Sequence, residues 1–208
     1  MKRSQRRRIV RDPDELPGPI ELAVSFTSLL ERLGISYLVA GSLASSVHGE
    51  PRSTNDIDVV ADLRAIHVDR FLDAVSPEYY ASADAVRTAV ESGTSFNIIH
   101  LAAALKVDVF VTGSDPFEAE RLRHRERVRV SADPESFIYV DSAEHAALRK
   151  LEWYRRGGEV SERQMRDVVA ILRIQGARLD RLRLETWAAR LGVSDLLERA
   201  RTAAGLPG

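Results

Sequence analysis

The spacing of apolar residues changes along the chain, and each spacing indicates a type of element. Apolar residues three and four positions apart predict helices at 19–33, 43–48, 64–75 and 83–92. Short apolar runs predict strands, which are 36–40, 56–60, 96–101, 106–111 and 137–140. The mixture predicts an α+β fold, a small mixed β-sheet flanked by helices.

The last third of the chain shows only helical spacing. Ser142 is a suitable N-cap for a helix that ends at Gly157, and Ser161 with Gln164 has the pattern of a capping box for the next helix. Two further helices are expected at 179–191 and 194–204. We therefore predict three parts, listed by residue number: a basic flexible arm at 1–18, a core at 19–141 and a C-terminal helical bundle at 142–208.

Composition narrows the classes of site. The 208 residues contain no cysteine, which excludes disulfides, thiolate nucleophiles and zinc–thiolate centres, and 44% are apolar, enough for a sizeable core. We expect a cytoplasmic protein with no membrane segment, since no apolar run approaches spanning length. The net charge is -1, although the first eleven residues carry six basic side chains and no acid, so overall charge does not argue for a nucleic-acid partner.

Two aspartates one residue apart are the strongest chemical signal. Because side chains alternate along a strand, Asp56 and Asp58 should share a face, where their carboxylates repel each other unless a cation lies between them. Oxygen ligands favour Mg²⁺, with Mn²⁺ as a substitute. Upstream, Gly41 permits a tight turn, and Ser42 offers a hydroxyl and an N–H at an expected helix start, where phosphate binds favourably.

A third aspartate, Asp108, lies in the strand-like run at 106–111. We interpret this run and 96–101 as neighbouring antiparallel strands, which puts Asp108 beside the strand that carries Asp56 and Asp58. These three are the predicted catalytic and metal-binding residues.

Together these residues resemble the nucleotidyltransferase superfamily, whose motif is Gly-Gly or Gly-Ser, a spacer, then acid-apolar-acid, with a third acid on a later strand. The resemblance implies the nucleotidyltransferase fold and metal-dependent transfer of a nucleoside monophosphate from a nucleoside triphosphate. Arg52 and Thr54 occupy the segment that leads to the acids, and are predicted nucleotide-binding residues together with Gly41 and Ser42.

A later set of residues is similar to the motif of AbiEii-type nucleotidyltransferases, a group that includes toxins of toxin–antitoxin systems. The set is Lys150, Arg155, Arg166 and Asp167. The resemblance implies that Lys150 holds the triphosphate, that Asp167 helps to orient it, and that an antitoxin protein is a partner. The lysine usual in the family's first motif is missing here.

The acceptor stays open between two classes. We favour RNA, most simply the acceptor end of tRNA, because of the toxin resemblance, the basic arm and the odd-numbered arginines of 121–129, which would share one face if that segment were extended. The alternatives are a small antibiotic-type acceptor, which would need further acids such as Glu50, Asp62 and Glu91, and a non-catalytic nucleotide-binding or antitoxin-like module.

Several residues allow two interpretations. Arg52 either reaches a phosphate or braces its loop through a carboxylate. His48 either touches a ligand or packs at a helix end, Lys150 is either a ligand-binding or a snorkelling surface lysine, and the arginine run is either an RNA-facing ribbon or a solvated face.

Overall fold

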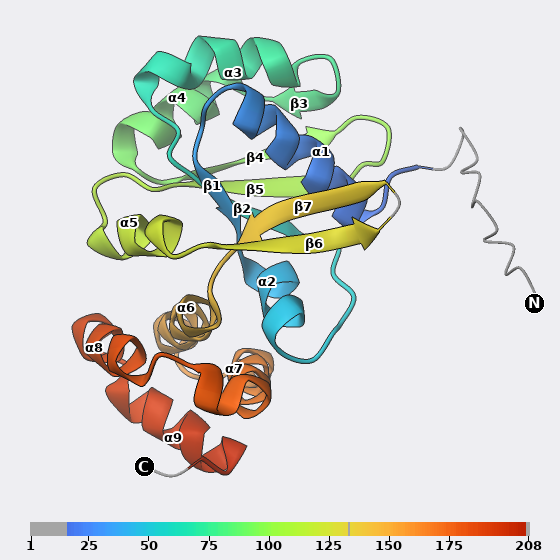
Figure 1. The fold of residues 1–208 in the computed structure, drawn as a ribbon. Helices are drawn as coiled ribbons and strands as arrows, with labels where there is room; N and C mark the ends of the chain where they lie inside the picture. The colour runs from blue at the N-terminus through green and yellow to red at the C-terminus, as the bar shows by residue number, and fades with distance from the viewer. Residues whose placement is uncertain (1–15, 133, 207–208) are drawn as a thin grey trace, which may run out of the picture.

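The computed structural model describes residues 16–132 and 134–206, so the predicted arm at 1–18 lies almost wholly outside the described part. Within that part a seven-stranded mixed sheet has the order β3-β4-β5-β2-β1-β7-β6, and helices lie on both sides of it (Figure 1). The predicted α+β fold is confirmed.

The strands β2 and β5 form the centre of the sheet and pair in parallel. Each has an antiparallel neighbour, β1 beside β2 and β4 beside β5, as predicted for the pair at 96–101 and 106–111. The strand bounds are β1 Tyr37–Val39, β2 Ile57–Ala61, β3 Tyr79–Ala81, β4 Ser95–His100, β5 Lys106–Val111, β6 Glu126–Ala132 and β7 Glu135–Val140. The sequence analysis did not predict β3, which is only three residues long, and did not decide whether the residues of β6 form a strand.

Helices α1, α3 and α4 cover one face of the sheet. The alternating side chains of the central strands explain why, since Ile57, Val59, Val107 and Val109 are fully buried while Asp58 and Asp108 on the opposite face are half-buried. The helix bounds here are α1 Pro19–Arg32, α3 Val68–Val75 and α4 Ala83–Ser92, with a short 3-10 turn at Ala65–His67 before α3. The aspartate face is thus the one left for chemistry.

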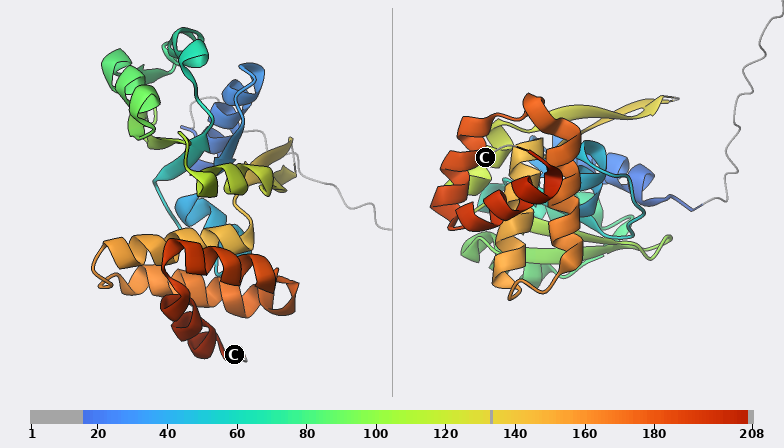
Figure 2. Two further views of the ribbon diagram at one scale, coloured as in Figure 1. Left: turned by 90° about the vertical axis from the view of Figure 1, so that its left-hand side faces the viewer. Right: turned by 90° about the horizontal axis from the view of Figure 1, so that it is seen from below.

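On the aspartate face, α2 (Gly41–His48) lies between the sheet and the C-terminal helices (Figures 1 and 2). Those helices are α6 Ala143–Arg156, α7 Glu162–Gln175, α8 Arg181–Leu191 and α9 Ser194–Ala204, and they share a second apolar cluster, which Phe117 of α5 (Pro116–Arg123) joins from the core. None of the helices in the described residues is long and apolar enough to cross a membrane.

The two helix caps predicted for the C-terminal region have different outcomes. Ser142 caps α6 by accepting a hydrogen bond from the His145 N–H. The capping box at Ser161 and Gln164 is wrong, since the Ser161 side chain makes no capping hydrogen bond. Gln164 instead accepts a hydrogen bond from Lys150 Nζ at 3.3 Å, because α7 packs alongside α6.

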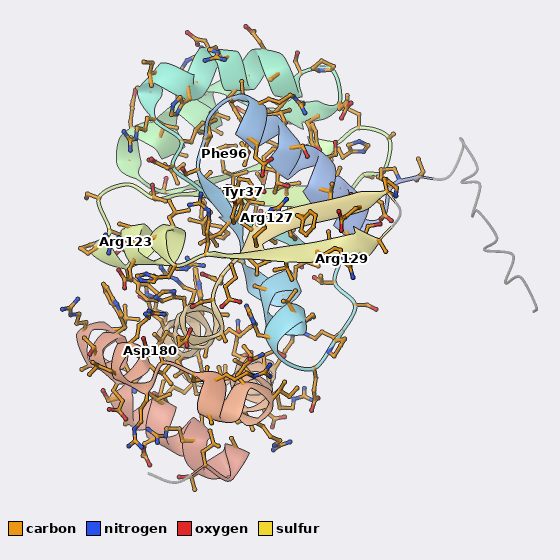
Figure 3. The ribbon with its side chains drawn as sticks, viewed as in Figure 1. Tyr37, Phe96, Arg123, Arg127, Arg129 and Asp180 are labelled. Carbon is orange, nitrogen blue, oxygen red and sulfur yellow. The ribbon has the colours of Figure 1, made fainter. Side chains whose placement is uncertain are left out.

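The arginine run divides between two elements and does not form one ribbon. Arg121 and Arg123 belong to α5, whereas Arg127 and Arg129 lie along β6 (Figure 3). Arg121 is 2% exposed and donates two hydrogen bonds to Asp141, from Nε at 3.0 Å and from Nη2 at 2.6 Å. It is neither solvated nor available to RNA, so both interpretations are wrong for this residue.

Arg121 joins the sheet to the helical region through buried charge. Its Nη1 also contacts Glu118 at 2.7 Å, and Glu118 pairs with Arg149 of α6. Burial acts to lower the pKa of Arg121, but the Asp141 and Glu118 carboxylates outweigh it and raise that pKa above its ordinary value. Removing one member would leave an uncompensated buried charge.

Replacing Arg121 with methionine should therefore reduce the free energy of unfolding in urea by about 3–5 kcal/mol, because Asp141 loses its buried partner. The matched control is Arg123→Ala on the same helix, where the side chain is 67% exposed and pairs with Glu120. That change should cost less than about 1 kcal/mol. Equal costs for the two variants would contradict the buried-network account.

Candidate active site

A cleft of about 790 Å³ lies between the aspartate face of the sheet and helices α6 and α7. We call Asp56, Asp58 and Asp108 the acidic wall. The basic wall comes from the helical region and consists of Arg149, Lys150, Arg156 and Arg163. Gly41, Ser42 and Arg52 line the cleft between the two walls, so seven of the nine predicted site residues gather there.

Gly41 has a structural reason to be glycine. Its φ is +57°, and a Cβ at this position would stand 1.9 Å from Asp58 Oδ2. Only a bare backbone fits beside that carboxylate, so the turn from β1 into α2 brings the start of the helix directly onto the acidic wall. The Ala40 N–H donates to the Asp58 carbonyl at 2.8 Å and fixes the approach.

The acidic wall is made by strand register. Asp58 and Asp108 are direct partners on the parallel strands β2 and β5, and Asp56 lies in the exposed loop just before β2. Burial, then repulsion from Asp108 and Asp56, raises the pKa of Asp58. The wall therefore favours a bound cation.

The chemistry of this wall fits a divalent ion such as Mg²⁺, although the carboxylates are not yet gathered around one point. Among the described residues no three histidine, aspartate or glutamate side chains are arranged to hold a metal ion. On the same wall, Lys106 Nζ contacts Asp108 Oδ2 at 2.7 Å. This hydrogen bond raises the pKa of Lys106, and the charges of Asp56 and Asp58 add to the effect. The Lys106 ammonium group thus supplies part of the positive charge that a metal ion would bring.

The phosphate-binding features converge at the first turn of α2. Ser42 is 7% exposed, and its hydroxyl accepts hydrogen bonds from Arg52 Nη2 at 2.5 Å and from Arg163 Nη2 at 3.3 Å. Arg52 Nε and Arg149 Nε are buried without a hydrogen-bond partner among the described residues. The Arg52 guanidinium, hydrogen-bonded to Ser42 beside a helix N-terminus, suits an anion.

Lys150 is a buried residue of the cleft, and the snorkelling-surface interpretation is wrong. It is 7% exposed, and its Nζ contacts Asp167 Oδ2 at 2.8 Å. Burial lowers the pKa of Lys150, an effect to which Arg52 and Arg163 add and which Asp167 opposes. Burial alone would raise the pKa of Asp167, but hydrogen bonds from Lys150 and Arg52 hold it below the ordinary value.

Arg52 contacts both sides of the cleft entrance. Besides Ser42 it reaches Asp167 Oδ2 at 3.1 Å. Asp167 therefore ties Arg52, from the loop after α2, to Lys150 on α6. The bracing that we considered for Arg52 is present. Its Nε is buried without a hydrogen-bond partner among the described residues, so it would reach a phosphate only if the side chain moved.

Some residues of the predicted motifs lie elsewhere. Thr54 does not line the cleft; its hydroxyl accepts from the Asp56 N–H at 3.2 Å. His48 is buried, with Nε2 2.5 Å from the Asp141 carbonyl oxygen, as expected for a packing residue. Arg155 pairs with Glu159 and Asp195 outside the cleft.

The acids suggested for a cationic acceptor are not in the cleft either. These acids are Glu50, Asp62 and Glu91, and Asp62 pairs with Arg64 at 2.6 Å. Their positions remove the sequence basis for an acidic acceptor pocket.

The sequence analysis did not predict five of the cleft residues, which are Lys106, Arg149, Trp153, Arg156 and Arg163. Helix and strand periodicity could have indicated four of them, since Arg156 lies three positions after Trp153 on α6. Arg163 lies four positions before Asp167 on α7, and Trp153 lies three positions after Lys150 on α6. Lys106 is two positions before Asp108 on one strand face. Arg149 had no comparable signal, since its place depends on Glu118 of α5.

Comparison with models of known protein families and with curated proteins finds no match. Solved structures do match. A nucleotidyltransferase-like antigenic protein from Paracoccidioides brasiliensis aligns over 85% of this chain and 90% of its own, with a TM-score of 0.51 and 16% identity. The fold is that of the nucleotidyltransferases.

A second match is the antibiotic-resistance factor ANT(2'')-Ia, which aligns over 83% of this chain and 92% of its own, with a TM-score of 0.51 and 10% identity. At these identities the likeness establishes the nucleotidyltransferase fold and leaves the activity of this chain to be argued from its own residues.

Asp58 provides a stability test of the acidic wall. Because the folded protein raises the pKa of Asp58, protonated Asp58 contributes stability below the ordinary aspartate pKa, and this contribution is lost as pH rises through the raised pKa. Ionised Asp58 therefore destabilises the fold at pH 7. Asp58→Asn should therefore raise the thermal midpoint at pH 7 by about 2–4 °C, and the gain should shrink toward about pH 4.

The control is Asp69→Asn, because the Asp69 side chain is 87% exposed. This substitution should change the thermal midpoint by less than about 1 °C. Added Mg²⁺ should stabilise the unaltered protein more than the Asp58→Asn variant. A variant that melts lower than the unaltered protein without divalent ions would show that the wall is not under repulsion.

Proposed function

We propose that the chain is a metal-dependent nucleotidyltransferase that moves a nucleoside monophosphate from a nucleoside triphosphate to an acceptor hydroxyl. The observation that carries the proposal is a single cleft with three carboxylates on one wall and four cationic side chains on the other. A triphosphate with its metal ion needs both, and phosphoryl chemistry needs positioning and charge neutralisation more than covalent catalysis.

The β and γ phosphates bind at the first turn of α2 in this proposal. Ser42 and the N–H groups of that turn donate to phosphate oxygens, and the guanidinium of Arg52, whose Nη2 contacts Ser42, adds positive charge. Lys150 and Arg163 supply positive charge at the leaving pyrophosphate, and Asp167 orients Lys150 and Arg52.

Asp56 and Asp58 would hold Mg²⁺, or Mn²⁺ in its place. When bound there, the ion supplies positive charge that stabilises the entering and leaving oxygens of the displacement. Lys106 would then leave Asp108, which becomes free to share the ion or to accept a proton.

The chemical step balances without a further reagent. The acceptor oxygen forms a bond to the α-phosphorus, and the bond from that phosphorus to the bridging oxygen breaks, which releases pyrophosphate. The acceptor proton passes to Asp108, whose register beside Asp58 puts it on the reacting face.

For the acceptor we retain RNA, with tRNA as the first candidate. The lining of the cleft supports this choice, because its seven cationic side chains outnumber its five carboxylates, which favours RNA phosphates over a polycationic antibiotic. Arg127 and Arg129 on β6 lie outside the cleft, where Arg129 pairs with Glu135 at 3.6 Å and Arg127 stacks over the Phe137 ring at 3.8 Å, so they do not bear on the choice of acceptor. The proposed toxin role and antitoxin partner depend only on the resemblance of the motif that contains Lys150 to that of AbiEii-type nucleotidyltransferases.

The direct test is incubation with each labelled nucleoside triphosphate and Mg²⁺, with total RNA, purified tRNA or cell metabolites as acceptors. Label should move to RNA, and Asp108→Asn should slow transfer by about 10²–10⁴-fold through loss of the proton acceptor. Asp58→Asn should also abolish measurable transfer while remaining folded.

Asp62→Asn is the matched control, because Asp62 directly follows β2 but pairs with Arg64 outside the cleft, and it should leave transfer unchanged. Label on a small metabolite and never on RNA would favour the small-molecule class. No turnover by the unaltered protein with any acceptor, despite nucleotide binding, would favour a non-catalytic module.

A further inference from the structure

Trp153 is an aromatic residue of the cleft that the proposed chemistry does not use. The chain has two tryptophans. Trp187 is 9% exposed and packs against Phe117 with ring centroids 5.0 Å apart, whereas Trp153 is 47% exposed and lines the cleft. A half-exposed indole contributes little to the core, so its position calls for another explanation.

The neighbours of Trp153 on α6 are charged groups of the basic wall. Lys150 lies three residues earlier on the same helical face, a rise of about 4.5 Å. Arg156 lies three residues later, with its guanidinium carbon 5.8 Å from the Trp153 ring centroid, and it pairs with Glu152 at 2.6 Å. The indole therefore stands between two cations in a cleft built for an anion.

This setting selects a ligand that is both planar and anionic. A protein partner or a lipid would meet two cations beside one aromatic ring, which is a poor apolar surface. A nucleotide matches both features, since its ring can stack on the indole while its phosphates reach Lys150. In a nucleoside triphosphate one sugar joins base and phosphates, so the base must lie a short step from the phosphate site, as Trp153 does.

We propose that Trp153 is the stacking surface for the base of the nucleoside triphosphate, an inference that rests on the proposed function. The base lies on the indole, with Arg156 beside it, and the triphosphate extends toward Lys150 and the first turn of α2. Trp153 is a binding residue and takes no part in the transfer of the proton or phosphorus.

Stacking has a consequence for nucleotide choice. Every base has an aromatic face, so a stacking surface accepts all four bases and holds the larger purine rings more firmly. The enzyme should therefore bind ATP and GTP more tightly than CTP and UTP, with no sharp distinction within each pair.

The experiment compares two probes that differ by the nucleoside. Binding of ATP and of inorganic tripolyphosphate, each with Mg²⁺, is measured by calorimetry for the unaltered protein and for Trp153→Ala and Trp153→Phe. Trp153→Ala should weaken ATP binding about tenfold and tripolyphosphate binding by less than about twofold. Trp153→Phe keeps an aromatic face and should retain ATP affinity within about threefold.

Arg163→Ala is the matched control on the phosphate side, because Arg163 contacts Ser42, and it should weaken both probes equally. An unchanged ATP affinity in Trp153→Ala, or an equal loss for both probes, would overturn the stacking role while leaving the phosphate site intact. A change confined to the acceptor KM would assign the indole to the acceptor and also overturn it. If the unaltered protein bound neither probe, the proposed function itself would fail.

Discussion

Repulsion between carboxylates on adjacent strands is the constraint around which this molecule is arranged. Asp58 and Asp108 are held side by side by the register of β2 and β5, and Gly41 closes against Asp58 so tightly that no side chain fits. Burial and repulsion raise the pKa of Asp58, and the Lys106 ammonium group offsets part of the charge. Proteins keep such costly arrangements at functional sites, where a ligand relieves them.

The helical region supplies the complementary charge and is tied to the core by buried ion pairs. Asp167 of α7 links Lys150 of α6 with Arg52 of the core, and Glu118 links Arg121 with Arg149. Because Lys150 and Arg149 are anchored in this way, this part of the basic wall is positioned before any ligand arrives. Such preorganisation would reduce the cost of binding the proposed triphosphate.

The local elements were accessible from sequence because they depend on short-range periodicity. The predicted shared strand face of Asp56 and Asp58 is wrong, since Asp56 lies in the exposed loop before β2. Strand alternation placed Asp58 opposite the core, and Ser142 was identified as a cap from its own helix. The antiparallel pairing of β4 and β5 also followed from neighbouring runs. Three-residue β3 lacked enough alternation to be seen.

The features that the sequence did not predict depend on contacts between distant segments. The burial of Arg121 requires Asp141, twenty residues away, to be folded beside it. The role of Gln164 depends on how α7 packs on α6, and that packing replaced the expected capping box. Of the arginine run only Arg121 contradicts the solvated-face interpretation, since Arg123, Arg127 and Arg129 are exposed. A charge pattern does not reveal which member finds a buried partner.

A crystal structure with Mg²⁺ and a non-hydrolysable nucleoside triphosphate analogue would test the central claim most directly. The account predicts a metal ion held by Asp56 and Asp58, Lys106 moved off Asp108, and the triphosphate at the first turn of α2 between Ser42, Arg52 and Lys150. A nucleotide bound instead in the second cavity, between α1 and the β6–β7 hairpin, would contradict it. So would phosphates that lie away from α2.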